Sequence, residues 1–319
     1  RVTVRYYNPF IPLNDRDSSI PALFADILVE NTTDRPITYT TAGIITNPCQ
    51  SSFTRNRFRE GNGIRGIHFT TEEIDKGDVS YSDFTLATDS EAVCQEYWFR
   101  GNWRDHVETY WREFASAKPL ENRRYESGKK DYKDTGMPWK NYYAVLFEDS
   151  WASASYAMHN RQRLLGETLT FMDAMYETTI PEAALDAVTA NLAILRSPTC
   201  LRLEDGSFYG WEGCFDNVGS CEGTCTHVWN YAYALPFLFP ALARSIRDLE
   251  FRYSQRTDGG IEFRLRLPVG STGKWFHSCA DGQLGSIMLT YRDYKISGDR
   301  EWLASKWESV KKALAYAWS

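Results

Sequence analysis

Hydrophobic and polar residues alternate in short runs over the first hundred residues, which is the pattern of half-buried β-strands. β-Branched and aromatic residues are frequent in these runs, and Gly, Asn, Asp and Pro residues separate them. The runs cover residues 2–7, 25–30, 37–45, 67–69 and 80–86. Short strands separated by turns in this way predict an antiparallel β-sandwich.

From about residue 141 onward, hydrophobic residues recur with the spacing of amphipathic helices. The predicted helices cover residues 150–176, 180–195, a stretch from 226, 281–297, and a last one that begins at 299 or 300 and still runs at 319. Consecutive helix–loop–helix pairs are the units of which an α/α barrel is built. The order of the whole chain is therefore β followed by α.

Local signals set several helix boundaries. Thr226 can cap the third helix, and Pro236 and Pro240 must kink or divide it, because proline lacks a backbone N–H. Gly298 should stop the fourth helix, and Asp299 can open the fifth.

The sequence pattern changes between the two halves of the chain. Residues 98–117 have aromatic residues at helical spacing, and residues 118–137 are polar and charged, as in a linker. We therefore predict two domains, a β-domain over 1–140 and a helical domain over 141–319. The chain starts directly in strand-like sequence and ends within a predicted helix, so we expect a fragment that lacks the start of the first domain and the end of the second.

Composition removes several classes of function. The 319 residues are 43% hydrophobic and 15% aromatic with a net charge of −6, and they contain no basic block, so nucleic acid is not an expected partner. No run of 18 apolar residues is present, so no transmembrane segment is expected. The spacing of Cys214, Cys221, Cys225 and His227 fits no standard zinc pattern, and we expect neither a metal nor an organic cofactor.

The most informative motif places one carboxylate among aromatic residues. Residues 205–213 read DGSFYGWEG, so that Glu212 lies between Trp211 and a glycine, and residues 226–231 read THVWNY. Aromatic faces stack on sugar rings, and a carboxylate beside them can attack or stabilise an oxocarbenium-like carbon. The alternative is a turn that carries a surface glutamate next to buried aromatic side chains.

Four ordered segments carry a resemblance to a known family. They are residues 8–21 (NPFIPLN and SIP), 187–198 (AVTANLAILRSP), 208–213 (FYGWEG) and 291–299 (YRDYKISGD), the last followed by Trp302, Leu303 and Trp307. Together they resemble glycoside hydrolase family 116, the group of the non-lysosomal glucosylceramidase and its prokaryotic β-glucosidase relatives.

The resemblance implies a β-sandwich followed by an (α/α)6 barrel of the six-hairpin glycosidase type, and a retaining β-glycosidase. Glu212 corresponds to the catalytic nucleophile. The acid/base aspartate of the family lies beyond residue 319, so we expect the isolated chain to be inactive or nearly so. Five helices after residue 141 make up about half of such a barrel.

The sequence also departs from the family pattern. Well-known members carry a His–Asp pair that grips sugar hydroxyls between the nucleophile helix and the helix of residues 291–299. Residues 259–268 contain no such pair here, while His277 and Asp281 lie nearby without being clearly equivalent. The insertion at 214–225 is longer than expected. Both differences concern the identity of the sugar more than the reaction.

The candidate substrate-binding residues each have a structural alternative. Trp211 and Trp229 could be sugar platforms or core residues, and His227 could line the sugar subsite or pack inside the helical domain. Asn230 lies one helical turn from His227, so both can face one side. Asp281 could contact sugar or simply cap a helix.

Four other acids are assigned structural or solvated roles. They are two loop acids, a charge on a helix face and a helix cap, namely Asp216, Glu222, Asp293 and Asp299.

The sequence thus predicts a retaining β-glucosidase or glucosylceramidase-like hydrolase that acts on a β-glucoside or a related glycan or glycolipid through Glu212. Two alternatives remain at this level. One is another α/α-barrel carbohydrate enzyme, either an inverting hydrolase or a phosphorylase. The other is a non-catalytic carbohydrate-binding protein.

Overall fold

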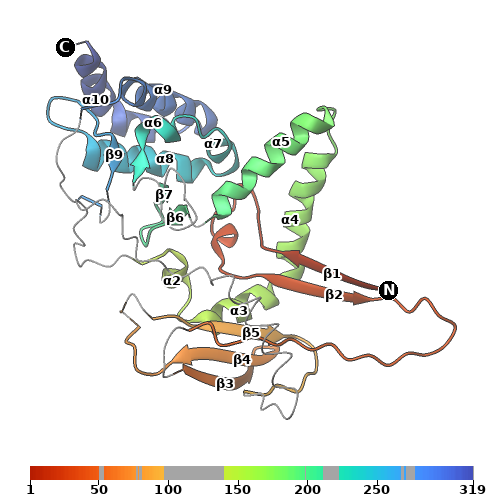
Figure 1. Cartoon of the computed structure of the whole chain (residues 1–319). Coiled ribbons are helices and arrows are strands. Elements are labelled where there is room, and N and C mark those ends of the chain that lie inside the picture. Colours follow the sequence, from red (N-terminus) through yellow and green to blue (C-terminus); the bar gives the residue numbers. More distant parts are fainter. Residues whose placement is uncertain are drawn as a thin grey trace. The chain divides into compact units, whose positions relative to one another are not determined.

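The computed structural model describes residues 1–49, 54–76, 78, 81–96, 140–197, 199–210, 223–266, 269–270 and 277–318 (Figure 1). The chain forms two compact units. The first unit takes its residues from 1–9, 20–124 and 146–166, and the second from 10–19, 125–145 and 167–319. Neither unit is a continuous piece of sequence. The domain boundary at residue 140 stays a prediction.

The strands of the first unit form two small antiparallel sheets. β1 (Val2–Tyr7) pairs with β2 (Phe24–Val29). Tyr7 at the end of β1 stacks on Phe24 at the start of β2. The second sheet has the order β3-β4-β5, made by the strands Thr54–Gly61, Ile64–Thr71 and Phe84–Thr88. Strand signals near 2–7, 25–30, 67–69 and 80–86 are confirmed.

The turn between β3 and β4 follows from two residues. Asn62 and Gly63 both have positive φ, 54° and 74°, as a two-residue type I′ hairpin turn requires. Asn and Gly reach this region at low cost, and the turn sets the register in which Gly61 faces Ile64. β3 was not among the predicted strands.

The strand predicted over 37–45 is absent from the structure, although these residues are all described. The segment is irregular, and Ile37, Tyr39, Ile44 and Ile45 are exposed. β-Branched and aromatic residues favour a strand only when a neighbouring strand and a buried face are available, and this segment has neither. The prediction for 37–45 was therefore wrong.

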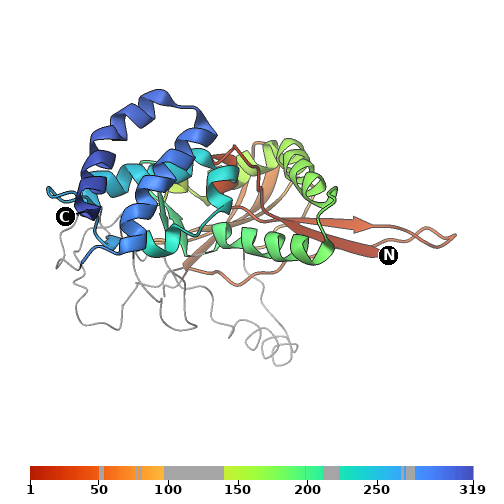
Figure 2. The same cartoon turned by 90° about the horizontal axis from the view of Figure 1, so that it is seen from above.

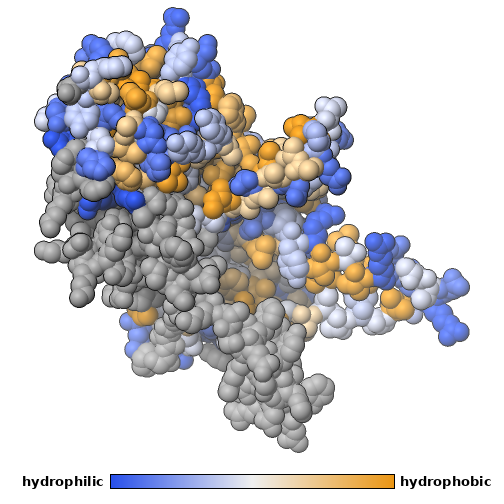
Figure 3. All heavy atoms as spheres, turned by 45° about the horizontal axis from the view of Figure 1, so that its top comes forward, coloured by the Kyte–Doolittle hydropathy of each residue, from blue (hydrophilic) through white to orange (hydrophobic). Residues whose placement is uncertain are grey.

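Exposed apolar side chains also occur on the first sheet. Val2, Tyr6, Ile27 and Leu28 are all exposed on the β1–β2 pair. Figure 3 shows hydrophobic residues as orange patches between blue polar ones.

Helices α3 (Ser150–His159) and α4 (Arg161–Tyr176) replace the single helix predicted over 150–176. Asn160 separates them with φ −97° and ψ 7°, and its amide donates to the carbonyl of Tyr156. Side-chain bonding of Asn to the local backbone competes with continuation of a helix, which explains the break.

The start of α3 is fastened to the second sheet by acidic residues. Asp149 is the N-cap and accepts from the Ala152 amide at 2.8 Å, and its other oxygen pairs with Arg59 of β3 at 3.0 Å. Asp83 accepts from the Ser150 amide at 2.8 Å and from His68 of β4 at 3.1 Å. Strand and helix are thus joined by charges that also satisfy free helix amides.

The second unit consists mainly of helices with short strand pairs between them. Its helical elements are α2 (Tyr143–Leu146), α5 (Glu182–Leu192), the 3₁₀ turn η2 (Ala193–Arg196), α6 (Thr226–Trp229), α7 (Ala234–Leu238), α8 (Pro240–Leu249), the π-helix η3 (Glu250–Ser254), α9 (Ala280–Ser297) and α10 (Arg300–Ala317). Its strands pair as β6 (Cys200–Arg202) with β7 (Phe208–Gly210) and β8 (Thr224–Cys225) with β9 (Arg264–Leu265). α9 and α10 lie side by side, as Figures 1 and 2 both show.

The prolines divide the helix that begins at 226 in the way the sequence indicates. Pro240 is the first residue of α8, where the absence of its N–H costs nothing. Thr226, however, is the first helical residue and Cys225 occupies the N-cap position, so the predicted cap was one residue too late. The Thr226 hydroxyl donates to the carbonyl of Phe263 instead.

The last two helices have the predicted boundaries at their junction. α9 ends at Gly298, which has φ 68°, a left-handed conformation that glycine adopts freely. Asp299 caps α10 by accepting from the Trp302 amide at 2.9 Å. α10 ends at Ala317, slightly before the predicted position.

The core of the second unit joins α7 and α8 to strand β7. A cluster of buried side chains is formed by Phe208, Trp229, Leu235, Phe239, Leu242, Ala243 and Ile246. The N-terminal segment 10–19 belongs to the same unit. Phe10 packs on Phe171 and Phe239, and the Leu13 amide donates to the carbonyl of Leu238 at 2.8 Å.

The predicted order of β followed by α is confirmed. Closure of the strands into a sandwich and of the helices into an (α/α)6 barrel remains a prediction.

Candidate functional site

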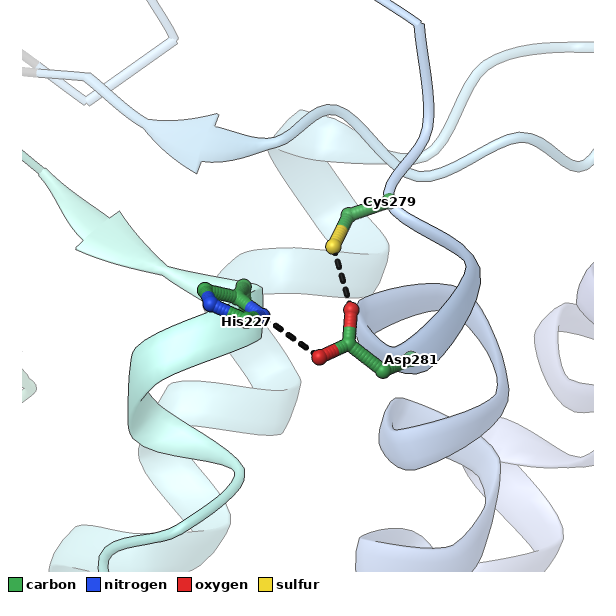
Figure 4. Close-up of side chains that lie close together, drawn as sticks. All are labelled: His227, Cys279 and Asp281. Carbon is green, nitrogen blue, oxygen red and sulfur yellow. Dashed lines mark hydrogen bonds and ion pairs between the residues drawn. The ribbon is translucent and has the colours of Figure 1, made fainter.

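The N-terminal ends of α6 and α9 bring three chemically different side chains together. His227 comes from α6, Asp281 from the first turn of α9, and Cys279 from the residue that precedes α9 (Figure 4). α6 and α9 pack against each other within the second unit. A histidine and an aspartate separated by 54 residues therefore meet in space.

Asp281 is the acceptor for all of its neighbours. Its Oδ2 lies 2.5 Å from Nδ1 of His227 and accepts from the Tyr231 hydroxyl at 3.1 Å. Its Oδ1 accepts from the Cys279 thiol and from the Gly282 amide at 2.9 Å. The carboxylate plane is thereby fixed by donors on both oxygens.

These contacts set the protonation states of the cluster. The hydrogen bond from Cys279, followed by those from His227 and Tyr231, lowers the pKa of Asp281 to about 2. Burial raises the pKa of the Cys279 thiol, and its bond to Asp281 adds to the effect. The bond to Asp281 likewise raises the pKa of Tyr231. Near neutral pH the cluster therefore presents one carboxylate flanked by a neutral thiol and a neutral phenol.

The pair remains open to solvent. The side chains of His227 and Asp281 are 47% and 40% exposed, and the ring of Tyr231 stands edge-on to His227 with centroids 5.9 Å apart. A ligand with hydroxyl groups can therefore reach the carboxylate oxygens without rearrangement of the core.

Asn230 holds the pair in place. Its amide donates to the backbone carbonyl of Asp281 at 2.9 Å, and the residue is nearly buried. Gly285 faces this amide so closely that a Cβ there would overlap it. His227 and Asn230 do face the same side of α6, because both contact Asp281. Asn230 thus positions the backbone that carries the carboxylate.

Trp229 lies in the core instead of on an open surface. It is 8% exposed and packs edge-on against Phe208, with ring centroids 5.0 Å apart. Its indole also lies against Gly210, where any Cβ would overlap the ring. The structure thus supports the packing alternative for Trp229, as a support for the end of β7.

Trp211 and Glu212 lie outside the described residues, as do Cys214, Cys221, Asp216 and Glu222. The residues that flank this segment are described. Gly210 at the end of β7 donates its amide to the hydroxyl of Thr224 in β8 at 3.2 Å. β8 leads directly into α6 and His227. The described residues on either side of the Glu212 segment therefore lie in neighbouring strands, and the second of these strands leads into α6 and His227.

The structure also places His277 and the residue that caps α9. His277 contacts the carbonyl of Ser278 at 3.2 Å, so the pair with Asp281 is formed by His227. Asp281 is not the N-cap of α9, a position that Cys279 occupies.

Asp293 was predicted to be a charge on a helix face, and the structure places it in the interior. It is 2% exposed and bonds to Arg292 at 2.9 Å. Nearby, Arg247 and Glu250 form a buried ion pair at 2.7 Å. Burial raises the pKa of both Asp293 and Glu250. Of the two aspartates of α9, Asp293 faces inward, where Arg292 bonds to it and the charge of Arg247 acts on it.

Two groups of side chains among the described residues have metal-ligand character. Ligand atoms of His227, Cys279 and Asp281 all lie within 4.8 Å of one another, and those of His68, Asp83 and Asp149 do so in the first unit. In the second group the Arg59 guanidinium already neutralises Asp149. Cys279 was not among the predicted site residues, and Tyr231 was predicted only as one of the aromatic residues of the motif at 226–231. The only signal was that Cys279 lies two residues before Asp281 in the sequence.

Comparison with known proteins identifies the class of the N-terminal part. Residues 1–137 match the family model described as beta-glucosidase 2, glycosyl-hydrolase family 116 N-term. The match defines a domain of glycoside hydrolases. The matched model belongs to glycoside hydrolase family 116, the family that the sequence motifs resemble, and of the four motifs it contains the one at residues 8–21.

The family match ends before the helices of the second unit, so Glu212 and the His227–Asp281 pair lie outside it. No curated protein matched the chain. No helix in the described part of the chain has both the length and the apolar character needed to span a bilayer.

Proposed function

We propose that this chain carries part of the active site of a retaining β-glucosidase, with Glu212 as the nucleophile and His227 and Asp281 as the residues that grip the sugar. The observation that carries the proposal is the open His227–Asp281 pair, whose histidine lies in α6 directly after β8, the strand that follows the Glu212 segment in the sequence. The family match supports the reaction class.

The geometry of the pair suits recognition of vicinal hydroxyl groups. The Asp281 oxygens can accept from sugar hydroxyls, and hydrogen bonds to an ionised acceptor are about twice as strong as neutral ones. His227 orients the carboxylate and offers its second ring nitrogen to an adjacent hydroxyl. The exposed ring of Tyr231 adds an apolar face of the kind on which sugars stack.

The covalent step would proceed at the anomeric carbon. A carboxylate oxygen of Glu212 attacks C1 and forms an ester-like bond, while the bond between C1 and the leaving oxygen breaks and the leaving group takes the electron pair. A second carboxyl group about 5–5.5 Å from the first protonates the leaving oxygen and later activates water. The substrates we propose are β-glucosides or related glycans and glycolipids.

The test uses a substrate whose leaving group needs no protonation. 2,4-Dinitrophenyl 2-deoxy-2-fluoro-β-glucoside should release one equivalent of dinitrophenolate per chain, because the activated phenolate departs unaided and the fluorine slows hydrolysis of the intermediate. Mass spectrometry of the digested protein should then locate the fluoroglucosyl group on the peptide that contains Glu212.

Two variants make this test specific. Glu212→Gln should release no phenolate and take up no label, while Glu204→Gln, an exposed glutamate in the preceding turn, should react like the unmodified chain. Labelling at another carboxylate would overturn the role of Glu212. Sugar binding without any label would support an inverting enzyme or a carbohydrate-binding protein instead.

A further inference from the structure

The three side chains at the sugar-gripping pair supply three different ligand elements. His227 offers the nitrogen Nδ1, Cys279 the sulfur Sγ and Asp281 a carboxylate oxygen, all within 4.8 Å of one another (Figure 4). Two secondary-structure elements hold them, and both belong to the second unit. Glycoside hydrolysis through two carboxylates makes no use of the thiol. Cys279 is therefore the member of the cluster that the proposed function leaves unexplained.

A nucleophilic role for Cys279 does not fit the order of the contacts. In a Cys–His nucleophile the histidine lies next to the sulfur and removes its proton. Here Asp281 lies between the two, accepting from the Cys279 thiol on Oδ1 and bonding His227 through Oδ2. Such an arrangement keeps the proton on sulfur and does not produce a thiolate nucleophile.

The same contacts suit a metal ion of borderline softness. A set of nitrogen, sulfur and oxygen ligands is typical of Zn²⁺, whereas Ca²⁺ and Mg²⁺ favour oxygen ligands alone. In a tetrahedral zinc site the ligand atoms lie about 3.5 Å apart, given metal–ligand bonds of about 2.0–2.3 Å. The ligand atoms of the three side chains all lie within 4.8 Å of one another, so the cluster is compact enough to close around one ion.

The exposure of the cluster indicates an open coordination position. Three protein ligands leave the fourth corner of a tetrahedron to water or to another small molecule. With His227 and Asp281 more than one-third exposed, that corner faces solvent. A metal ion here would engage the Asp281 carboxylate, which otherwise accepts from the sugar, and the Nδ1 atom of His227, which otherwise orients that carboxylate.

We propose that His227, Cys279 and Asp281 bind a Zn²⁺ ion, and that the ion and a glucose-configured ligand exclude each other. On binding, the ion displaces the thiol proton and replaces the hydrogen bonds that join the three side chains. The competition rests on the proposed function, whereas the metal site does not. Zinc would thus be a reversible inhibitor of sugar binding that acts directly at the sugar subsite.

The metal site is tested first, with Zn²⁺ and with Co²⁺ as a spectroscopic substitute, on the full 319-residue chain. Titration calorimetry should show one Zn²⁺ per chain, and Co²⁺ should give a thiolate-to-metal absorption band. Cys279→Ser should lose the band and bind Zn²⁺ more than about tenfold more weakly, since even loss of an outer-shell partner costs 10–100-fold. His227→Gln should weaken Zn²⁺ to a similar extent.

Matched controls separate this site from other thiols and from general metal binding. Cys94, a partly exposed free cysteine of the first unit, provides the control variant Cys94→Ser, which should leave Zn²⁺ affinity unchanged. Ca²⁺ should not compete with Zn²⁺. Unaltered Zn²⁺ affinity in both Cys279→Ser and His227→Gln would overturn the site.

The competition is tested with the glucose-configured iminosugar 1-deoxynojirimycin. Saturating Zn²⁺ should weaken its apparent affinity more than tenfold in the unmodified chain and by less than twofold in Cys279→Ser, whose own affinity for the iminosugar also shows that it is folded. If the iminosugar binds equally well with and without Zn²⁺, the exclusion is wrong and the sugar site stands. If Zn²⁺ binds but the iminosugar never does, the proposed sugar site fails while the metal site stands.

Discussion

Asp281 Oδ2 and His227 Nδ1 lie 2.5 Å apart across the junction of α6 and α9. The Asn230 side chain donates to the backbone carbonyl of Asp281. The Cys279 thiol and the Gly282 amide donate to Oδ1, the other carboxylate oxygen. The carboxylate is thus oriented before any ligand arrives. Orientation in advance reduces the entropy lost on binding, which is where affinity for small polar ligands is commonly gained.

Replacement of Asp281 by Asn should weaken binding of a glucose-configured iminosugar by about 10-fold or more, since hydrogen bonds to charged groups contribute about 1.5–3 kcal/mol. Titration calorimetry at pH 7 measures the effect. Glu301→Gln, a charge change of the same kind on exposed α10, should have no effect on binding. Equal affinity of Asp281→Asn and the unmodified chain would remove Asp281 from the sugar site.

The first unit should lose stability in acid through Asp83 and Asp149. Burial alone would raise the pKa of Asp149, but the Ala152 amide and then the Arg59 guanidinium outweigh it and lower the pKa; for Asp83, His68 and the Ser150 amide do the same. Groups with a lowered folded pKa contribute stability above their unfolded pKa of about 3.9, and that stability is lost as the pH falls through the folded value.

The variant Asp149→Asn tests this origin of the acid sensitivity. Asn is also a good N-cap but cannot form an ion pair with Arg59. The free energy of unfolding, measured in urea, should therefore fall by about 1 kcal/mol at pH 7 and change little at pH 3. A loss of the same size at both pH values would contradict an electrostatic cause.

Loss of Arg247 should strongly destabilise the second unit, because Glu250 would remain buried without a counter-charge. Arg247→Met should cost about 3–5 kcal/mol at pH 7 in chemical unfolding. The cost should shrink as the pH is lowered, since burial raises the pKa of Glu250 and protonation removes the buried charge. The double variant Arg247→Met, Glu250→Leu should recover most of the loss. If it does not, the packing of Arg247 matters more than its charge.

Two glycine substitutions should act in opposite directions. Gly210→Ala places a Cβ within the Trp229 indole and should destabilise by about 1–3 kcal/mol, while disturbing the backbone that leads to Glu212. Gly166→Ala lies in exposed α4 with open space around the new methyl group, and should stabilise by about 0.5–1 kcal/mol. Thermal unfolding of both variants checks the signs, and a neutral Gly210→Ala would show that Trp229 can move away.

The features that the sequence predicted correctly are those that interactions between neighbouring residues determine. β1 and the α9–α10 junction were predicted because local residues decide them, as Gly298 and Asp299 show. The hairpin turn at Asn62–Gly63 is also determined locally, because both residues adopt positive φ, although β3 was not predicted. The irregular 37–45 segment was mispredicted because a strand depends on a partner, which local propensity does not reveal.

The site was only partly predictable for the same reason. His227 and Asp281 were each named as candidates, but their pairing depends on how α6 packs on α9, 54 residues away. The burial of Asp293 depends likewise on α8, because Arg247 and Arg244 of that helix act on its charge together with the neighbouring Arg292. Cys279 has no role in the family chemistry, so only three-dimensional proximity brings it into the cluster.

The segment 10–19 has a consequence for the order of events during synthesis. It lies between β1 and β2, which can pair as soon as both have left the ribosome. Its partners in the helical part of the second unit come much later: the carbonyl of Asp15 accepts from Arg202, 187 residues further on. At about 5–20 residues per second, the ribosome needs roughly 10–40 seconds to add that length. During this interval Phe10 and Ile11 have no core to enter, so the nascent chain exposes an apolar segment that a chaperone could protect until the helices emerge.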